Sequence, residues 1–243
     1  MNNRRFVDVI TESAANYPEN IFTRRGAVYT CVNPFSYHMV RRNEVLYAQM
    51  DGLFVDGMLM CKLINLLWSR RIPRLSFDMS GMAVDLFGRL DKSDETIYFI
   101  GARQESLERT VSEIRRAYPG MHIRGFRNGY FRDERERSEA IREIVASGAD
   151  FTVVGMRSPL QERFGLDLKE AGYEGIVFTC GGFLHQTADG INYYPAWVNR
   201  YNLRAFYRLY REKGLFKRLY NVLIEFPILF TLDTVATHFG RER

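Results

Sequence analysis

Short apolar or β-branched runs recur along the chain, and each has the length of a strand. Helix-like segments separate most of them. Strands that alternate with helices of this length predict βαβ units, and so an α/β fold: a Rossmann-like, mostly parallel sheet with helices on both faces. The runs are GAVYTCVN (26–33), GLFVDG (52–57), IPRLSF (72–77), TIYFIGA (96–102), MHIRGF (121–126), DFTVVG (150–155) and GIVFTCGG (175–182).

Two helices have the clearest signals. One follows the fourth run: Ser106 is expected to cap it, and Pro119-Gly120 to end it. Another is expected over residues 132–148, with Gly148 at its end. Apolar residues of the first helix recur three or four apart, at Leu107, Val111, Ile114 and Tyr118.

Composition restricts the class of protein. Of 243 residues, 46% are hydrophobic and 26% are charged, which is typical of a globular chain of one domain or two small ones. No secretory signal and no run of about 18 uncharged apolar residues is found, so no membrane span is expected. The cysteines are odd in number and lack metal-ligand spacing, which favours a reducing compartment. They are Cys31, Cys61 and Cys180.

The charge is unevenly placed. A net charge of +5 and a pI near 9.1 make phosphates, nucleic acid or an acidic membrane surface plausible partners. Positive charge gathers between residues 200 and 218, where Glu212 is the single acid. The basic residues there are Arg200, Arg204, Arg208, Arg211, Lys213, Lys217 and Arg218.

Several predicted strands end in residues that a plain turn does not require. In parallel sheets, ligands bind beyond the carboxyl ends of the strands, near helix N-termini that attract anions. In GMRSPLQERF (155–164), Ser158 can cap the next helix and Pro159 suits its first turn. Gln161 and Glu162 would then face the ligand, although a surface connection without a ligand is an equally open interpretation. Other strand ends supply Asn33, Asp56, Gly57, Gly101, Gly181, Gly182 and His185.

Familiar nucleotide and metal motifs are absent from the sequence. There is no GxxxxGK[ST] loop, no GxGxxG follows a strand, and no DxD pair occurs. A nicotinamide-type oxidoreductase is therefore disfavoured, and neither a metal nor a cofactor is expected. A basic module that only binds nucleic acid or membrane would leave the strand-end residues without a purpose, so no nucleic-acid partner is expected.

Four blocks of the chain form an ordered set: VDG (55–57), YPGMHIRGFRNGYF (118–131), GMRSPLQERF (155–164) and the segment from Gly181 to Tyr220. In that order they resemble the hallmark blocks of the WecG/TagA/CpsF glycosyltransferases, glycosyltransferase family 26. The family pattern is PDG, then GYF, then GxPxQE, then GG with a later aromatic YRL segment. The similarity extends from about Ala27 to Tyr220.

The resemblance implies a metal-independent, inverting transfer of a sugar from a UDP-sugar to a polyprenyl-pyrophosphate-linked sugar. Such enzymes serve capsule, exopolysaccharide or teichoic-acid-type synthesis at the cytoplasmic face of the membrane. The alternative is a non-catalytic, Rossmann-like protein that binds a nucleotide or a membrane.

The resemblance also suggests roles for residues. Asp56 matches the acid of the PDG block and is expected to be the general base; a β-turn Asp-Gly is the plainer interpretation. Asn33 would hold the sugar or orient the base. Without a metal, arginines must stabilise the leaving UDP, and Arg208 and Arg218 match basic family positions. The remaining candidates for substrate or nucleotide binding are Gly57, Arg74, Asp78, Gly101, Gln161, Glu162, Gly181, Gly182 and His185.

The chain departs from the family pattern at several positions. Cys31 stands where the family has a Thr two residues before Asn33, and His185 stands where it has an acid. Arg204 replaces a Glu, and YYP (193–195) replaces RAP. His185 is expected either to alter the choice of donor or to pack beneath a loop, so the donor cannot be copied from a relative.

The last segment is apolar but interrupted by Glu225, Pro227 and Asp233. We expect a domain of residues 1–195 and an appendage of residues 196–243 that closes the site. The appendage is also expected to dock peripherally on the inner face of the membrane. A core-facing helix or a homo-oligomer contact would have the same spacing of apolar residues: Leu219, Val222, Leu223, Phe226, Leu229 and Phe230.

Overall fold

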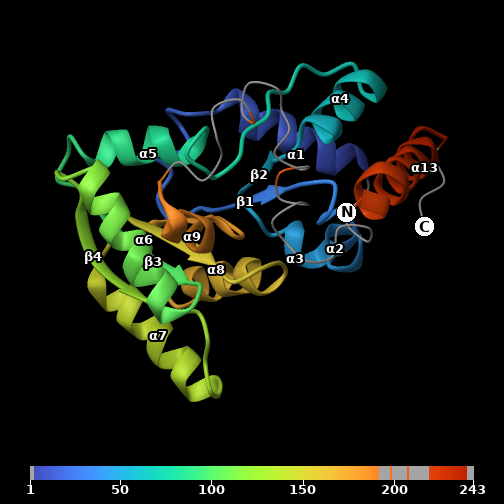
Figure 1. Cartoon of the computed structure of the whole chain (residues 1–243). Coiled ribbons are helices and arrows are strands. Elements are labelled where there is room, and N and C mark those ends of the chain that lie inside the picture. The colour runs from blue at the N-terminus through green and yellow to red at the C-terminus, as the bar shows by residue number, and fades with distance from the viewer. Residues whose placement is uncertain (1–2, 192–197, 199–206, 208–218, 240–243) are drawn as a thin grey trace.

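Six parallel strands form the centre of the molecule (Figure 1). A computed structural model describes residues 3–191, 198, 207 and 219–239. The strand order is β2-β1-β6-β5-β3-β4, and every neighbouring pair is parallel. The predicted α/β fold is confirmed. The strands are β1 (Val28–Val32), β2 (Gly52–Val55), β3 (Thr96–Gly101), β4 (His122–Arg127), β5 (Phe151–Gly155) and β6 (Ile176–Thr179).

Helices cover both faces of this sheet (Figure 1). The face that we call the α6 face packs against α5 (Met82–Leu90), α6 (Gln104–Ala117) and α9 (Phe183–Gln186). The opposite face, the α8 face, packs against helices from the N-terminal, middle and C-terminal parts of the chain. They are α1 (Asn3–Ala15), α2 (Tyr37–Arg42), α3 (Glu44–Tyr47), α4 (Met58–Leu67), α7 (Glu134–Ser147), α8 (Leu160–Glu170) and α13 (Phe226–His238).

Alternation along the strands separates the two cores. In β3, Ile97 and Phe99 belong to the α6 face, whereas Tyr98 and Ile100 belong to the α8 face. All of them are at most 1% exposed. Because successive side chains of a strand point to opposite faces, a strand that is buried on both sides is a continuous apolar run.

The run at 72–77 is not a strand, so that prediction is wrong. The structure assigns it no regular element, and one backbone hydrogen bond ties it to the sheet, from Leu75 N to Val55 O at 3.0 Å. Pro73 lacks an N–H, and the N–H of Ile72 donates to the side chain of Asn65 at 2.9 Å. Neither Ile72 nor Pro73 can therefore donate a backbone hydrogen bond to a neighbouring strand.

The two predicted helices form, with one boundary corrected. Helix α6 begins at Gln104 with Arg103 as its N-cap, so Ser106 lies inside the first turn and is not the cap. Helix α7 has Asp133 as N-cap, whose carboxylate accepts from Glu136 N at 2.8 Å. Its end at Gly148, with φ of 60°, confirms the expected glycine stop.

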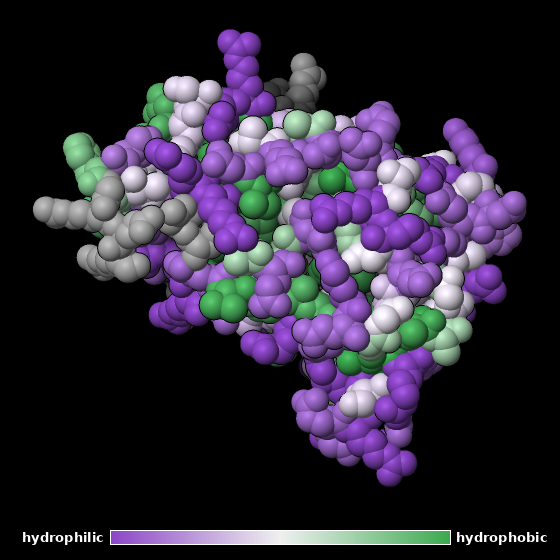
Figure 2. All heavy atoms as spheres, turned by 180° about the vertical axis from the view of Figure 1, so that it is seen from behind, coloured by the Kyte–Doolittle hydropathy of each residue, from purple (hydrophilic) through white to green (hydrophobic). Residues whose placement is uncertain are grey.

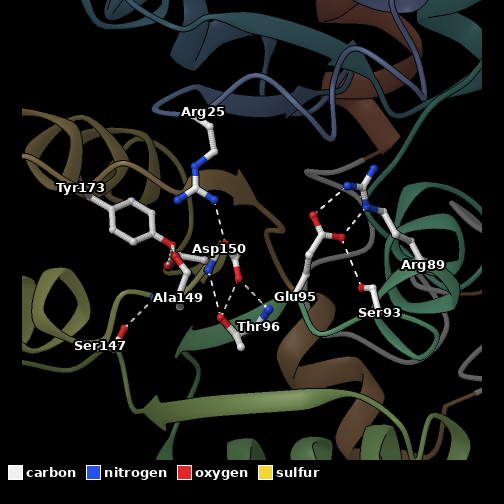
Figure 3. Close-up of polar contacts among 10 residues, drawn as sticks. Arg25, Arg89, Ser93, Glu95, Thr96, Ser147, Ala149, Asp150 and Tyr173 are labelled. Atoms are coloured by element: carbon white, nitrogen blue, oxygen red, sulfur yellow. Dashed lines mark hydrogen bonds and ion pairs between the residues drawn. The ribbon is translucent and has the colours of Figure 1, made fainter.

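Carboxylates and a tyrosine organise the amino edge of the sheet (Figure 3). Asp150 accepts hydrogen bonds from both the N–H and the hydroxyl of Thr96, each at 2.9 Å, and pairs with Arg25 at 2.7 Å. Burial alone would raise the pKa of Asp150, but these bonds outweigh it, so the pKa is lowered. Tyr173 donates to Ala149 O at 2.8 Å. Side chains thus anchor the starts of β3 and β5.

Helix α13 packs on the N-terminal part of the chain, beside α1 and α4 (Figure 1). Phe226 and Phe230 are 1% and 0% exposed, and both rings contact Tyr37. Asn3 donates to Phe230 O at 3.3 Å, and Asp233 pairs with Arg41 at 2.7 Å. The core-facing interpretation of this segment therefore holds for one side of α13. The predicted domain boundary at residue 195 lies outside the described residues.

Candidate functional site

Along the carboxyl edge from β1 to β4, the helices that follow neighbouring strands leave to opposite faces of the sheet. Helix α8, which follows β5, covers the α8 face, whereas α6 and α9, which follow the neighbouring β3 and β6, cover the other face. Neighbouring strands whose helices leave to opposite faces define the place where open α/β sheets bind ligands. We call the carboxyl ends of β3, β5 and β6 the switch region.

Next to the switch region, an arginine links two predicted site carboxylates. Arg74 Nη2 donates to Asp56 Oδ1 at 2.8 Å and to Asp78 Oδ2 at 2.9 Å. The three side chains are 18%, 28% and 18% exposed for Arg74, Asp56 and Asp78, so the group is reachable but largely enclosed. Among the described residues, no hydrogen bond reaches Asp56 Oδ2. One carboxylate oxygen of Asp56 is thus held while the other is available to a substrate.

Asp78 positions this group. Its Oδ2 accepts from Ser76 Oγ at 2.7 Å, and its Oδ1 accepts from Ser80 N at 2.8 Å. Burial of the guanidinium would lower the pKa of Arg74, but Asp56 and Asp78 together raise it. Arg74 therefore stays a cation between two anions, and the group of three carries a net negative charge.

Asn33 lies beside Gly57 at the ends of β1 and β2. A Cβ added to Gly57, whose φ is 144°, would lie 2.8 Å from Pro34 Cδ and 4.0 Å from Asn33 Cβ. Asn33 Oδ1 accepts from Ser36 N at 2.9 Å, which closes the turn into α2. Burial raises the pKa of the Cys31 thiol well above its usual range, and Asp56 adds to the rise. Cys31 thus presents a neutral thiol near Asp56.

Gln161 and Glu162 are buried, 3% and 0% exposed. Gln161 Oε1 accepts from Gly181 N at 3.0 Å, and its Nε2 donates to Glu162 Oε1 at 2.9 Å. Gln161 therefore connects α8 to the turn after β6. Burial raises the pKa of Glu162. Direct contact of this pair with a ligand stays a prediction, and its described partners are protein groups.

Three hydroxyl residues around Glu162 had no place in the sequence-based site. Ser158 and Thr30 donate to Glu162 Oε1 at 2.9 and 2.8 Å, and Thr30 shares a 2.6 Å hydrogen bond with Thr179. Ser158 was expected to cap α8; the structure gives α8 no side-chain cap, so that expectation is wrong. Glu162 Oε2 and Tyr47 OH are buried without a hydrogen-bond partner among the described residues. Polar residues inside the apolar strand runs were the sequence signal for this network.

The predicted glycines fall into two groups. A Cβ on Gly101, with φ of 144°, would lie 2.4 Å from Gly155 O, so Gly101 lets two strand ends pack closely. Gly181, with φ of 57°, has open space where a Cβ would project. Gly182 is the N-cap of α9 and is exposed. Gly181 and Gly182 are thus the glycines that a ligand can approach.

His185 lies on α9 against α6. Its side chain is exposed, and Nδ1 is 3.5 Å from Ser106 Oγ. It is neither packed into the core nor adjacent in the described contacts to Asp56. Its expected influence on donor choice stays a prediction.

Some predicted residues lie outside the described part of the chain. They are Arg208 and Arg218, expected at the pyrophosphate, together with Arg204 and residues 193–195. Within the described residues, no group of three or more His, Cys, Asp or Glu side chains is arranged to hold a metal ion. In the same residues, no helix has the length and apolar character needed to cross a membrane.

Comparison with known proteins places the chain. It is 34% identical over 214 residues to a UDP-Gal:alpha-D-GlcNAc-diphosphoundecaprenol beta-1,4-galactosyltransferase of Shigella boydii, covering 88% of this chain and 90% of that protein. N-acetylglucosaminyldiphosphoundecaprenol N-acetyl-beta-D-mannosaminyltransferases are also similar. The one from Bacillus spizizenii (strain ATCC 23059 / NRRL B-14472 / W23) is 24% identical over 91% of this chain and 86% of its own length. The one from Bacillus subtilis (strain 168) is 26% identical over 81% of this chain and 76% of its own length. Residues 4–239 match the Glycosyl transferase WecG/TagA/CpsF family, and the chain therefore belongs to this family of glycosyltransferases.

Proposed function

We propose that the protein transfers a sugar from a UDP-sugar to a sugar carried on polyprenyl diphosphate, with inversion at the anomeric carbon. The Shigella relative is named for a UDP-sugar and a diphosphoundecaprenol-linked acceptor, and the Bacillus relatives are named for the same class of acceptor. These relatives span nearly the whole chain, which supports carrying the reaction class over. The product belongs to bacterial surface polysaccharide synthesis.

The observation that carries the proposal is the carboxylate of Asp56 at the carboxyl edge, which has a protein partner at one oxygen and, among the described residues, none at the other. Arg74 holds Oδ1 at 2.8 Å. Oδ2 accepts the proton of the acceptor hydroxyl as that oxygen attacks the anomeric carbon. The bond from the anomeric carbon to the β-phosphate oxygen breaks, and UDP leaves with the electron pair. One positioned base of this kind contributes on the order of 10²- to 10⁴-fold to the rate.

Arg74 and Asp78 position the base. Since Arg74 already serves two carboxylates, it has little positive charge to offer the leaving diphosphate. Other cations must supply that stabilisation. Arg208 and Arg218 are our candidates from the sequence, because both lie in the basic segment at 200–218.

Asn33 and Gly57 are proposed to line the acceptor side, since they lie against Asp56. Gly181 and Gly182, which Gln161 holds in place, are proposed to line the donor side with Gly101, Glu162 and His185 near them. Gln161 and Glu162 are proposed to hold the neighbouring turns in position, because both side chains are buried and hydrogen-bonded to protein groups.

A UDP-release assay tests the function. Wild type and Asp56→Asn are compared with a panel of UDP-sugars and a short-chain polyprenyl-diphosphate sugar, in EDTA. Release that requires the acceptor and falls at least a hundredfold in the variant supports the proposal and identifies the donor. Full activity of Asp56→Asn would remove Asp56 as the base.

We also propose that α13 docks on the membrane that carries the acceptor. Exposed apolar residues at helical spacing lie on α13 and on the residues that flank it, 220–225 and 239, in addition to the buried Phe226 and Phe230. On the face shown in Figure 2, hydrophobic groups are separated by hydrophilic side chains. An apolar stripe that directly follows a basic segment in the sequence suits an anionic lipid surface. The stripe is Tyr220, Leu223, Ile224, Ile228, Leu232, Val235 and Phe239.

Vesicle flotation tests the docking. Truncation is unsuitable, because α13 supplies core residues. Ile228→Lys should reduce binding to anionic vesicles, whereas Val84→Lys, an exposed position on α5 of the opposite face, should not. Equal binding of both variants would contradict docking through α13. A change in mass by light scattering would instead indicate a homo-oligomer contact.

A further inference from the structure

Arg157 has an unusual backbone at the exit of β5. Its φ is 65°, in the left-handed region that glycine and asparagine adopt more readily than arginine. Arg157 O accepts from Gln161 N at 3.0 Å at the start of α8, so the backbone of Arg157 is part of the turn into that helix. The side chain is not part of that bond. Glycine would form the same turn without backbone strain, so the turn does not explain why an arginine stands at this position.

The guanidinium of Arg157 is solvent-exposed. In the part of the chain that the structure describes, no carboxylate, hydrogen-bond acceptor or ring contacts it. Arg74 differs, since it lies between Asp56 and Asp78. At this edge, Arg74 is a neutralised cation and Arg157 is a cation with its charge available.

The position of Arg157 is the switch region. The three strand ends there are in backbone contact: a Cβ on Gly101 would lie 2.4 Å from Gly155 O, and one on Gly155 would lie 3.3 Å from Gly181 O. Arg157 follows the middle strand of the three by two residues. Gln161 links Arg157 to Gly181, because its N–H donates to Arg157 O and its Oε1 accepts from Gly181 N, each at 3.0 Å. Arg157 is thus at the edge where such a fold binds a ligand.

We propose that Arg157 binds a diphosphate of the substrates, as a further binding residue of this enzyme. The proposal rests on the function proposed above, because both substrates of that reaction carry a diphosphate. A guanidinium matches phosphate oxygens with paired N–H donors, and Arg157, unlike Arg74, has no carboxylate partner among the described residues. The diphosphate is either that of the UDP-sugar or that of the lipid-linked acceptor.

Arg157→Asn and Arg157→Lys test the inference by calorimetric binding of UDP and of inorganic pyrophosphate, and by the KM of donor and acceptor. Asparagine tolerates the left-handed backbone, so the melting temperature of Arg157→Asn should not fall below that of wild type. Its affinity for the bound diphosphate should fall about tenfold, equivalent to about 1.4 kcal/mol, with Arg157→Lys intermediate. The control is Arg115→Asn, at an exposed arginine in the last turn of α6. It should change neither the affinity for UDP or pyrophosphate nor the KM of either substrate.

The pattern of loss identifies the source of the diphosphate. Weaker UDP binding with a raised donor KM assigns Arg157 to the nucleotide; a raised acceptor KM with unchanged UDP binding assigns it to the lipid diphosphate. Values within twofold of wild type for both substrates and for pyrophosphate would overturn the inference. A wild type that binds no UDP would refute the proposed function instead, and the pyrophosphate comparison would still decide the role of Arg157.

Discussion

The two edges of the sheet carry similar residue types, but their carboxylates serve different partners. At the amino edge, Asp150 accepts from Thr96 N and Asp51 accepts from Val28 N, so both acids complete the backbone at the start of a strand. At the carboxyl edge, Asp56 bonds to Arg74 and keeps one oxygen available. The first arrangement uses charge to stabilise the fold, and the second leaves charge for chemistry.

Backbone conformation differs in the same way. At the carboxyl edge, left-handed residues follow strands within two residues, and two of them, Ala102 and Arg157, are not glycine. At the amino edge, the left-handed Gly148 and Gly172 end helices, where such glycines cost little. The other non-glycine residue with positive φ in the described part of the chain, Ser69, follows α4, so two of three such residues lie where the substrate is proposed to bind.

The largest contrast should come from matched removal of one acid at each edge. Asp56→Asn should lower turnover by about 10²- to 10⁴-fold, because it removes the proposed base, while its melting temperature changes little. Asp150→Asn should keep turnover per folded molecule within about twofold of wild type. Steady-state rates and calorimetric melting separate the two. A loss of turnover in Asp150→Asn at full folding would break the comparison.

Two glycines at the carboxyl edge should differ in how much stability the protein loses when each is replaced by alanine. Gly101→Ala should destabilise by about 3 kcal/mol or more, because its Cβ would lie 2.4 Å from Gly155 O and its φ is 144°. Gly181→Ala should cost about 1 kcal/mol, since open space surrounds that position. Denaturant melts measure both. Similar costs for the two would show that the close strand packing at Gly101 adds nothing.

The amino edge should lose stability in a pH-dependent way. Asp150→Ala should cost about 1–3 kcal/mol near neutral pH, because the N–H of Thr96 loses its acceptor. The folded-state pKa of Asp150 is lowered, so its contribution is present above its unfolded pKa and is lost as pH falls. The difference from wild type should therefore shrink in acid. Urea melts between pH 3 and 7 test this, and a constant difference would contradict it.

The contribution of Glu162, at the carboxyl edge, to stability should have the opposite pH dependence to that of Asp150 and a smaller size. Burial raises its folded-state pKa, so its contribution is present below its unfolded pKa and is lost as pH rises through the folded value. Glu162→Gln, which mimics the neutral acid, should gain up to about 1 kcal/mol over wild type from pH 5 to pH 8. A gain that does not depend on pH would indicate that the carboxyl is ionised throughout.

Particular residues show how far the sequence reaches. The placement of Asp56 and Asn33 at adjacent strand ends was predictable, because parallel strands bring their carboxyl ends to one edge. The pairing of Arg74 with both Asp56 and Asp78 was not, since the segment that carries Arg74 and Asp78 was predicted to be a strand. The same local view assigned Ser158 to a helix cap, whereas its hydroxyl bonds to the buried Glu162.

The sequence by itself determined the α/β class, the main helix stops and the family, and six of its seven predicted strand runs form strands, because each depends on local periodicity, turn residues or ordered motifs. Only the tertiary structure decided which polar groups became buried and which stayed reachable. Gln161 and Glu162 are buried because α8 folds onto β1 and β6, while the guanidinium of Arg157 stays in solvent. Burial and pairing depend on which distant segments meet, and spacing along the chain does not contain that information.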